Sequence, residues 1–243
     1  MSALAGSPTA TALTAGSSSS RNRSYTPRWT RIRDRAQQSW PALSNAATGA
    51  VAAARSRILV QRSVYDRFLE LLEPAVKAVA VGDPASPGTE MGPLISAEHR
   101  ARVAAYVPDG APVAFRGSAP EGRGYWFPPT VLAPVRLDDP AYTEEVFGPV
   151  VAVVPFEDEA QAVAMANDTP YGLSGSVWTR DVGRAIRVAR AVETGNLSVN
   201  SHSSVRYWTP FGGFKQSGLG RELGPDALDA FTEIKNVFIA TDT

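Results

Sequence analysis

The sequence predicts an α/β fold in which helices flank a mostly parallel β-sheet. From about residue 49 onward, short Val-, Ile- and Leu-rich runs alternate with helical patterns, as is typical of this class. The run 150–154 is continuously apolar and is closed by Pro155, which predicts a strand buried on both faces of a parallel sheet. A folded region of about 190 residues can bury roughly 70% of the surface that its unfolded chain exposes.

The first half of the folded region begins with an Ala- and Arg-rich stretch, residues 50–57, that is compatible with a helix. Residues 58–61 predict a strand. Ser63 is a candidate N-cap for a helix whose apolar residues recur at helical spacing until Gly82. Ser96 is a candidate cap for a second helix that carries His99 and Val103. His99 lies between Glu98 and Arg100, so we expect its side chain to be solvated.

The second half begins with an irregular stretch and then alternates strands and helices more regularly. Residues 110–124 are expected to be irregular, and residues 201–220 form a long loop rich in Gly and aromatic residues. Asp181 is a candidate cap for the helix that follows it. The predicted strands are 130–132, 150–155, 171–179, 195–200 and 234–240, and the predicted helices are 158–167, 181–189 and 225–231.

Residues 1–48 differ in composition from the rest of the chain. They hold six Arg and one Asp, and the first 20 residues are almost all Ser, Ala, Thr, Gly and Pro. Such a segment has too little apolar surface to offset the entropy of ordering, so we expect a disordered or low-complexity leader. A basic arm that binds nucleic acid is the alternative interpretation. We favour the leader because the arm is short and the remainder of the chain is acidic.

Composition excludes several classes of function. The chain has no cysteine, which excludes disulfides, thiolate nucleophiles and Cys-based zinc sites. The two histidines, His99 and His202, lack metal-ligand spacing, so no metal site is predicted. The formal net charge is zero and no apolar run approaches 18 residues, so neither a nucleic-acid partner nor a membrane partner is expected. Without an apolar N-terminal segment, the expected location is cytoplasmic.

Six ordered motifs identify a family resemblance. The densest is Pro210–Glu222, and the others keep the same order and spacing: 91–95, 127–131, 144–150, 167–173 and 196–200. Together they resemble the aldehyde dehydrogenase family over residues 49–243. The loop 201–208 is most similar to members that act on aminoaldehydes or betaine aldehyde. The resemblance implies a catalytic domain of this family, with NAD or NADP as the cofactor of the parent reaction.

The resemblance also assigns roles to individual residues. Glu145 matches the carboxylate that holds the nicotinamide-ribose hydroxyls, and Phe147 matches the residue that packs beside the nicotinamide ring. Val205 and Phe211 match residues that line the aldehyde tunnel, although core packing is an alternative role for Phe211. The C-terminal strand matches one that pairs between subunits, which implies a homo-oligomer or association with a full-length relative.

The sequence departs from the family at the nucleophile. In the motif Asn-x-Gly-Gln-x-Cys, only Gly49 is retained, and Ala52 stands where the cysteine belongs. A methyl group cannot add to an aldehyde, so no catalytic residue is predicted. Ser56 is the nearest hydroxyl, but no base is visible beside it. Lys215 and Arg221 are interpreted as structural loop charges.

The second departure is the lack of an N-terminal dinucleotide-binding domain in this chain. No strand, Gly-rich turn and helix occur in succession, so we expect Glu145 and Phe147 to be vestigial and NAD binding to be weak or absent. The leading hypothesis is a truncated, inactive homologue of aldehyde dehydrogenase. One alternative is a partner-binding or scaffold subunit of a full-length relative. Another is a non-redox enzyme that reuses the old tunnel with His202, Glu145 or Lys215.

Overall fold

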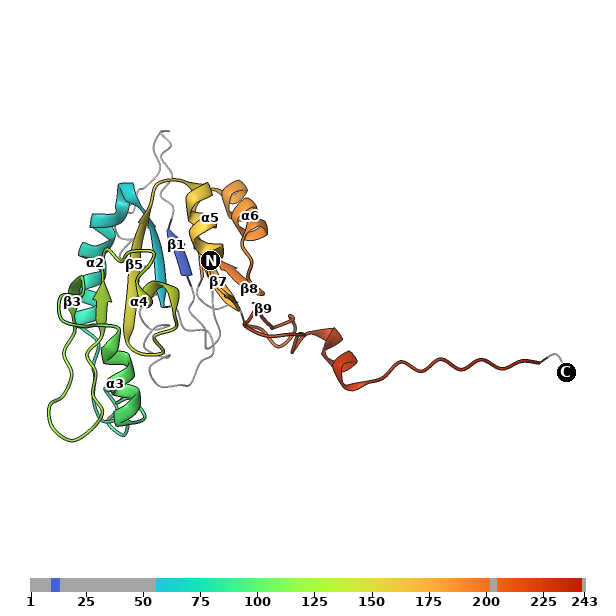
Figure 1. Ribbon diagram of the computed structural model, residues 1–243, viewed down its shortest axis with the longest axis horizontal. Helices are drawn as coiled ribbons and strands as arrows, with labels where there is room; N and C mark the ends of the chain where they lie inside the picture. Colours follow the sequence, from blue (N-terminus) through green and yellow to red (C-terminus); the bar gives the residue numbers. More distant parts are fainter. Residues whose placement is uncertain (1–9, 14–55, 202–204, 242–243) are drawn as a thin grey trace.

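A seven-stranded sheet forms the centre of the protein. The computed structural model describes residues 10–13, 56–201 and 205–241. The strands lie in the order β3-β4-β5-β2-β1-β7-β8, and all neighbours are parallel except β3 and β4 (Figure 1). Their bounds are β1 Ala10–Leu13, β2 Arg57–Gln61, β3 Val113–Arg116, β4 Thr130–Leu132, β5 Val150–Phe156, β7 Ser174–Trp178 and β8 Asn196–Val199. The predicted α/β class with a mostly parallel sheet is confirmed.

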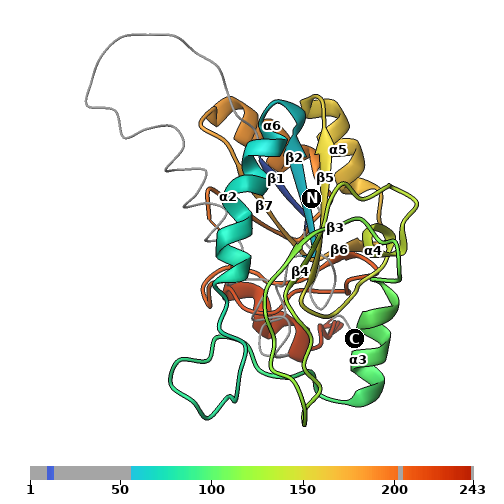
Figure 2. The ribbon, with the colours of Figure 1, turned by 90° about the vertical axis from the view of Figure 1, so that its left-hand side faces the viewer.

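Helices cover both faces of this sheet, which gives three layers. Helix α2 (Tyr65–Lys77) lies on the side of the sheet opposite α5 (Glu159–Asn167) and α6 (Val182–Ala191) (Figures 1 and 2). In β5, Val151 and Val153 join the core beneath α2, whereas Ala152 and Val154 join the core beneath α5 and α6. The continuous apolar run therefore follows from burial of both faces of the strand.

Two of the three predicted helix caps are confirmed. Ser96 accepts a hydrogen bond from the His99 backbone at the start of α3 (Ala97–Ala105), and Asp181 accepts one from Arg184 N at the start of α6. Asp158, which was not predicted as a cap, accepts one from Gln161 N at the start of α5. The prediction for Ser63 is wrong, because Ser63 lies inside a 3-10 turn, η1 (Arg62–Val64), and α2 begins only at Tyr65 without a side-chain cap.

The structure differs from the prediction at three segments. The stretch 110–124 contains β3, which is the antiparallel edge strand. The strand predicted over 171–179 is divided into β6 (Tyr171–Gly172), which pairs with β9 (Phe214–Lys215), and β7, which joins the main sheet. The division occurs at Leu173, where the chain passes from the two-stranded sheet of β6 and β9 to the seven-stranded sheet. The final predicted helix is a 3-10 helix, η2 (Pro225–Phe231).

The C-terminal residues 232–241 leave the body of the protein and form no strand (Figure 1). The strand predicted over 234–240 is therefore wrong for the single chain. A strand needs hydrogen bonds to a neighbouring strand, and none of the described residues provides one here.

Strand β1 lies within the segment 1–48 that we expected to be disordered. Its four residues pair in parallel with β2 on one side and β7 on the other. Composition does not indicate this strand, because backbone groups supplied by two distant strands stabilise it. The expectation of a leader without regular structure does not hold at these four residues. The helix considered over 50–57 lies mostly outside the described residues, and Arg57 belongs to β2.

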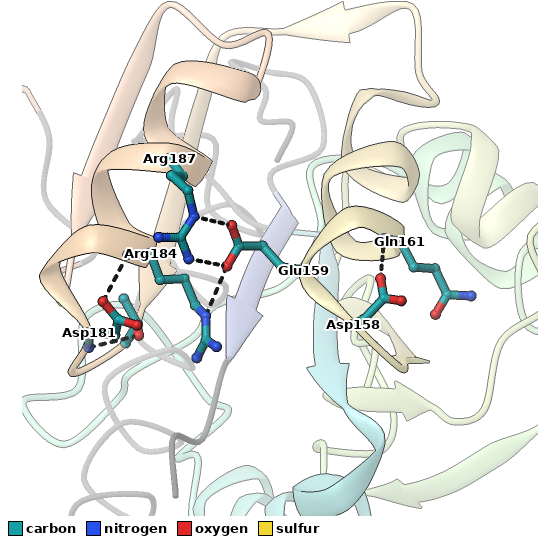
Figure 3. A network of polar contacts seen from close by, with 7 residues as sticks. Asp158, Glu159, Gln161, Asp181, Arg184 and Arg187 are labelled. Atoms are coloured by element: carbon teal, nitrogen blue, oxygen red, sulfur yellow. Dashed lines mark hydrogen bonds and ion pairs between the residues drawn. The ribbon is translucent and has the colours of Figure 1, made fainter. Parts of the chain in front are cut away.

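Helices α5 and α6 are joined by a polar network at their first turns. Both carboxylate oxygens of Glu159 accept hydrogen bonds from Arg187 at 2.8 Å, and Oε2 also accepts one from Arg184 at 3.0 Å (Figure 3). The hydrogen bond from Arg187 is the main cause of the lowered pKa of Glu159. The planar, bidentate contact favours one relative orientation of the two helices.

Candidate functional site

The segment that carries the predicted cofactor residues is a short loop, residues 144–149, between α4 (Pro140–Thr143) and β5. It is anchored at both ends by backbone hydrogen bonds. Glu144 N donates to Pro140 O over 2.9 Å, and Thr130 N donates to Pro149 O over 2.8 Å. The loop is therefore mounted on the central sheet, which restricts where its side chains can lie.

The two adjacent glutamates of this loop have different surroundings. The Glu144 carboxylate accepts a hydrogen bond of 2.8 Å from the hydroxyl of Tyr106. Glu145 is half-buried, and among the described residues none donates a hydrogen bond to its carboxylate. Burial raises the pKa of Glu145 to about 7. A desolvated carboxylate of this kind is suited to accept two hydrogen bonds from a vicinal diol.

Phe147 adopts an uncommon backbone conformation. Its φ is 51°, in the left-handed region, and 46% of the residue is exposed. The Phe147 carbonyl lies 2.8 Å from His99 Nε2, which donates the hydrogen bond because a carbonyl oxygen can only accept. The two rings are also in an edge-to-face arrangement, with centroids 6.0 Å apart.

His99 and Tyr106 were not identified from the sequence as functional residues. The expectation that His99 is solvated is wrong, since the residue is half-buried and its ring contacts Phe147. A signal was present, because His99, Val103 and Tyr106 have the spacing of one helical face. The spacing alone does not say which segment that face contacts.

The predicted tunnel residues lie in the long loop after β8. Val205 is 40% exposed. Phe211 is half-buried and forms an antiparallel bridge with Glu222, in which each backbone N–H donates to the other carbonyl, over 2.6 and 2.7 Å. Phe211 also lines an open pocket of about 610 Å³ with Leu173 and Phe231. No contact described for these residues joins them to Glu145 or Phe147, so the tunnel roles stay predictions.

Ala52, which the motif match places at the nucleophile position, lies outside the described residues, as does His202. Ser56 is half-buried, and its carbonyl accepts a hydrogen bond of 2.8 Å from Ala152 N. Among the described residues, none forms a hydrogen bond with the Ser56 hydroxyl.

The structural interpretation of the two loop cations is confirmed. Lys215 Nζ donates to the carbonyls of Asn167 (2.7 Å) and Thr169 (3.1 Å) and forms an ion pair with Glu193 at 2.6 Å. Arg221 Nη1 donates to the carbonyls of Gly213 and Gly220. Lys215 therefore holds the long loop against the body of the domain, whereas Arg221 links backbone groups within the loop.

Within residues 10–13, 56–201 and 205–241, no three or more His, Asp or Glu residues are grouped so that they could hold a metal ion. None of the helices in those ranges has the length and apolar character that a bilayer crossing requires.

Comparisons with known proteins match most of the chain. The profile of the aldehyde dehydrogenase family matches residues 34–237, so the match begins inside the segment 1–48. An aldehyde dehydrogenase of Emericella nidulans is 42% identical over 193 residues, which are 78% of this chain and 39% of that protein. A betaine aldehyde dehydrogenase of Bacillus subtilis is 40% identical over 198 residues, covering 78% of this chain and 40% of that protein.

Solved structures of aldehyde dehydrogenases also match most of the chain. A betaine aldehyde dehydrogenase from Staphylococcus aureus, in complex with NAD+, is 35% identical with a TM-score of 0.77, over 93% of this chain and 43% of that chain. A mutant aldehyde dehydrogenase from Bacillus cereus is 32% identical with a TM-score of 0.82, over 97% of this chain and 45% of that one. The chain thus spans about 40% of the length of the curated relatives that it matches.

Proposed function

Because the chain belongs to the aldehyde dehydrogenase family, we propose that it is a catalytic-domain homologue that does not by itself oxidise aldehydes. The proposal is supported by the motif match described above, which aligns Ala52 with the nucleophilic cysteine of the family. The parent reaction needs a thiolate that adds to the aldehyde carbon, and the chain contains no cysteine to supply one. Loss of a nucleophile in other enzymes lowers the rate by about 10⁶-fold.

We further propose that the loop 144–149 retains a partial cofactor site. The Glu145 carboxylate has the burial and free acceptor capacity to bind the two ribose hydroxyls of a nicotinamide cofactor. The Phe147 ring is exposed next to it and would pack against the nicotinamide. When bound, the oxidised cofactor supplies a hydride acceptor.

The affinity of that partial site for the whole dinucleotide is expected to be weak or nil. A carboxylate and one ring contact only the nicotinamide riboside half of NAD. The sequence contains no strand, Gly-rich turn and helix that would bind the pyrophosphate. The Staphylococcus aureus relative that holds NAD+ is more than twice as long as the matched segment. Binding of the complete cofactor would therefore need groups from outside this sequence.

An activity assay tests the proposal. The purified chain is incubated with NAD and a panel of betaine and aminoaldehyde substrates, beside an Ala52→Cys variant and an Ala52→Ser control. We expect no NADH absorbance at 340 nm from the unmodified chain. NADH formation by the unmodified chain, with host enzymes excluded, would contradict the inactivity. Activity in Ala52→Cys but not in Ala52→Ser would contradict the expected failure to bind NAD.

A second candidate function is that of a partner-binding subunit. The supporting observation is the segment 232–241, which pairs with no strand among the described residues and carries exposed apolar side chains, namely Ile234, Val237, Phe238 and Ile239. Extended segments of this kind can add a strand to the sheet of a second copy or of a full-length relative. Sedimentation of the chain beside a variant that lacks residues 233–243 tests this. A monomer in both cases would count against self-association.

The non-redox alternative receives less support. It requires an acid–base pair within hydrogen-bond reach. Lys215 is bound to two carbonyls and Glu193, and no hydrogen bond or ion pair described for Glu145 links the two residues. His202 lies outside the described residues.

A further inference from the structure

One face of helix α3 contacts the candidate cofactor loop at three successive places. His99, Val103 and Tyr106 occupy positions i, i+4 and i+7, which share one side of a helix. His99 bonds Phe147, Val103 packs against Gly148, and Tyr106 bonds Glu144. The contacted residues flank Glu145 in the sequence, because Glu144 precedes it and Phe147 and Gly148 follow it. Helix α3 and the loop 144–149 are far apart in the chain, so only the tertiary fold brings them together.

The contact made by His99 acts on the backbone of Phe147. Ser96 caps the helix by accepting a hydrogen bond of 3.0 Å from His99 N, which fixes the first turn. From there His99 Nε2 donates to the Phe147 carbonyl over 2.8 Å. A left-handed conformation is unfavourable for a residue with a side chain and persists only where the surroundings hold it. The hydrogen bond from His99 is one such restraint on the Phe147 backbone, and the edge-to-face contact places the His99 ring beside the Phe147 ring.

The contact made by Val103 explains why glycine follows Phe147. A Cβ atom at Gly148 would lie 2.6 and 2.7 Å from the two methyl groups of Val103. The helix and the loop backbone therefore approach one another more closely than any other residue would allow. Val103 is fully buried, so this contact lies in the core, between the two polar contacts of the same helix face.

The contact made by Tyr106 involves Glu144 and not its neighbour Glu145. Burial and the hydrogen bond to Glu144 raise the pKa of Tyr106 to about 12, so its hydroxyl stays protonated and donates. Glu144 is thereby held toward α3. Glu145 is the next residue, and no donor among the described residues competes for its carboxylate.

We propose that α3 is the positioning element of the cofactor loop, with His99 and Tyr106 as positioning residues for Phe147 and Glu145. His99 holds the peptide that orients the nicotinamide-facing ring. Tyr106 binds Glu144 and leaves Glu145 available for the ribose diol. This inference rests on the proposed cofactor contact. The two measurements can contradict the positioning roles and the cofactor contact separately.

The first measurement follows the loop itself, without any ligand. Backbone carbon chemical shifts of Phe147 and Gly148 are compared in the isotope-labelled full chain and in His99→Ala, His99→Gln and Arg102→Ala. Arg102 is a matched control, because it lies on α3 and forms an exposed ion pair with Glu98 at 3.9 Å, but it forms no described hydrogen bond with the loop 144–149. We expect the left-handed shift pattern of Phe147 to be lost in His99→Ala. It should persist in Arg102→Ala and in His99→Gln, whose amide can still donate. Unchanged shifts in His99→Ala would overturn the proposal.

The second measurement links the positioning to the cofactor. Nicotinamide riboside, which carries only the ring and the diol, is titrated into each variant and into Tyr106→Phe. We expect about 5- to 10-fold weaker binding in His99→Ala and Tyr106→Phe, the scale of one hydrogen bond. His99→Gln and Arg102→Ala should stay within about twofold of the unmodified chain. Equal affinity in all variants would overturn the positioning roles. Absence of binding to the unmodified chain would contradict the proposed cofactor contact, while the shifts still decide whether His99 holds Phe147.

Discussion

The hydroxyl of Tyr106 donates a hydrogen bond to the carboxylate of Glu144 over 2.8 Å. This contact distinguishes two glutamates that are adjacent in the sequence and identical in chemistry. Glu144 is bound to helix α3, whereas Glu145 has a raised pKa because its carboxylate is desolvated. Several measurable consequences depend on that difference and on the packing around it.

Replacement of Glu145 by glutamine should stabilise the fold at pH 8 and have little effect at pH 4.5. The folded chain holds the Glu145 proton up to about pH 7, whereas the unfolded chain releases it near the ordinary value of 4.5. The free energy of unfolding therefore falls between these pH values, and the loss is complete above pH 7. Glutamine has no proton to lose.

After allowance for solvent screening at a half-buried site, we expect Glu145→Gln to gain on the order of 1–2 kcal/mol at pH 8. Urea unfolding at both pH values measures the gain. Glu144→Gln serves as the control, and it should not reproduce the pH-dependent gain. A gain of equal size at both pH values would contradict desolvation as the cause.

Binding of nicotinamide riboside should strengthen as the pH rises through 7. The ionised carboxylate of Glu145 accepts both diol hydrogen bonds, whereas the protonated acid accepts fewer. With a pKa of about 7, the ionised fraction rises by about tenfold between pH 6 and pH 8. Calorimetric titration should show a similar rise in affinity. Nicotinamide without the ribose should show no such pH dependence, and Glu145→Gln should abolish it for the riboside.

Introduction of a methyl group at Gly148 should destabilise the domain. The added Cβ would lie 2.6 Å from a Val103 methyl group, so helix and loop would have to separate. Overpacking of this kind typically costs about 1–3 kcal/mol. The free energy of unfolding of Gly148→Ala measures the loss. The double variant Gly148→Ala/Val103→Ala should cost less than the sum of the two single changes, and strict additivity would contradict the contact.

Truncation of Lys215 should cost more stability than truncation of an ordinary surface cation. Lys215→Met removes the donor to the Asn167 and Thr169 carbonyls and the partner of Glu193. A loss of about 1–3 kcal/mol is expected, because hydrogen bonds from a charged donor are among the stronger ones. Arg136→Met is the control, since it removes only an exposed ion pair with Asp138 and should change stability by less than about 1 kcal/mol. Equal losses in thermal unfolding would show that Lys215 is not structural.

Local patterns in the sequence determined most of the fold. The apolar run of β5 and the caps Ser96 and Asp181 were predictable, because burial periodicity and capping depend on residues close together in the chain. The family motifs and the alanine at position 52 could also be identified without a structure. Ser63 was misassigned because a 3-10 turn precedes the helix there, which a side-chain pattern does not reveal.

Tertiary structure alone decided the remaining features. Strand β1 exists through pairing with β2 and β7, and the predicted strand over 234–240 is absent from the single chain because no described strand lies beside it. In the candidate site, the sequence determined which residues are present, including two adjacent glutamates and no thiol. The fold decided which glutamate is bound, by placing Tyr106 and His99 against a loop about 40 residues away. Hydrogen bonds between distant segments depend on packing geometry, and that geometry leaves no local pattern in the chain.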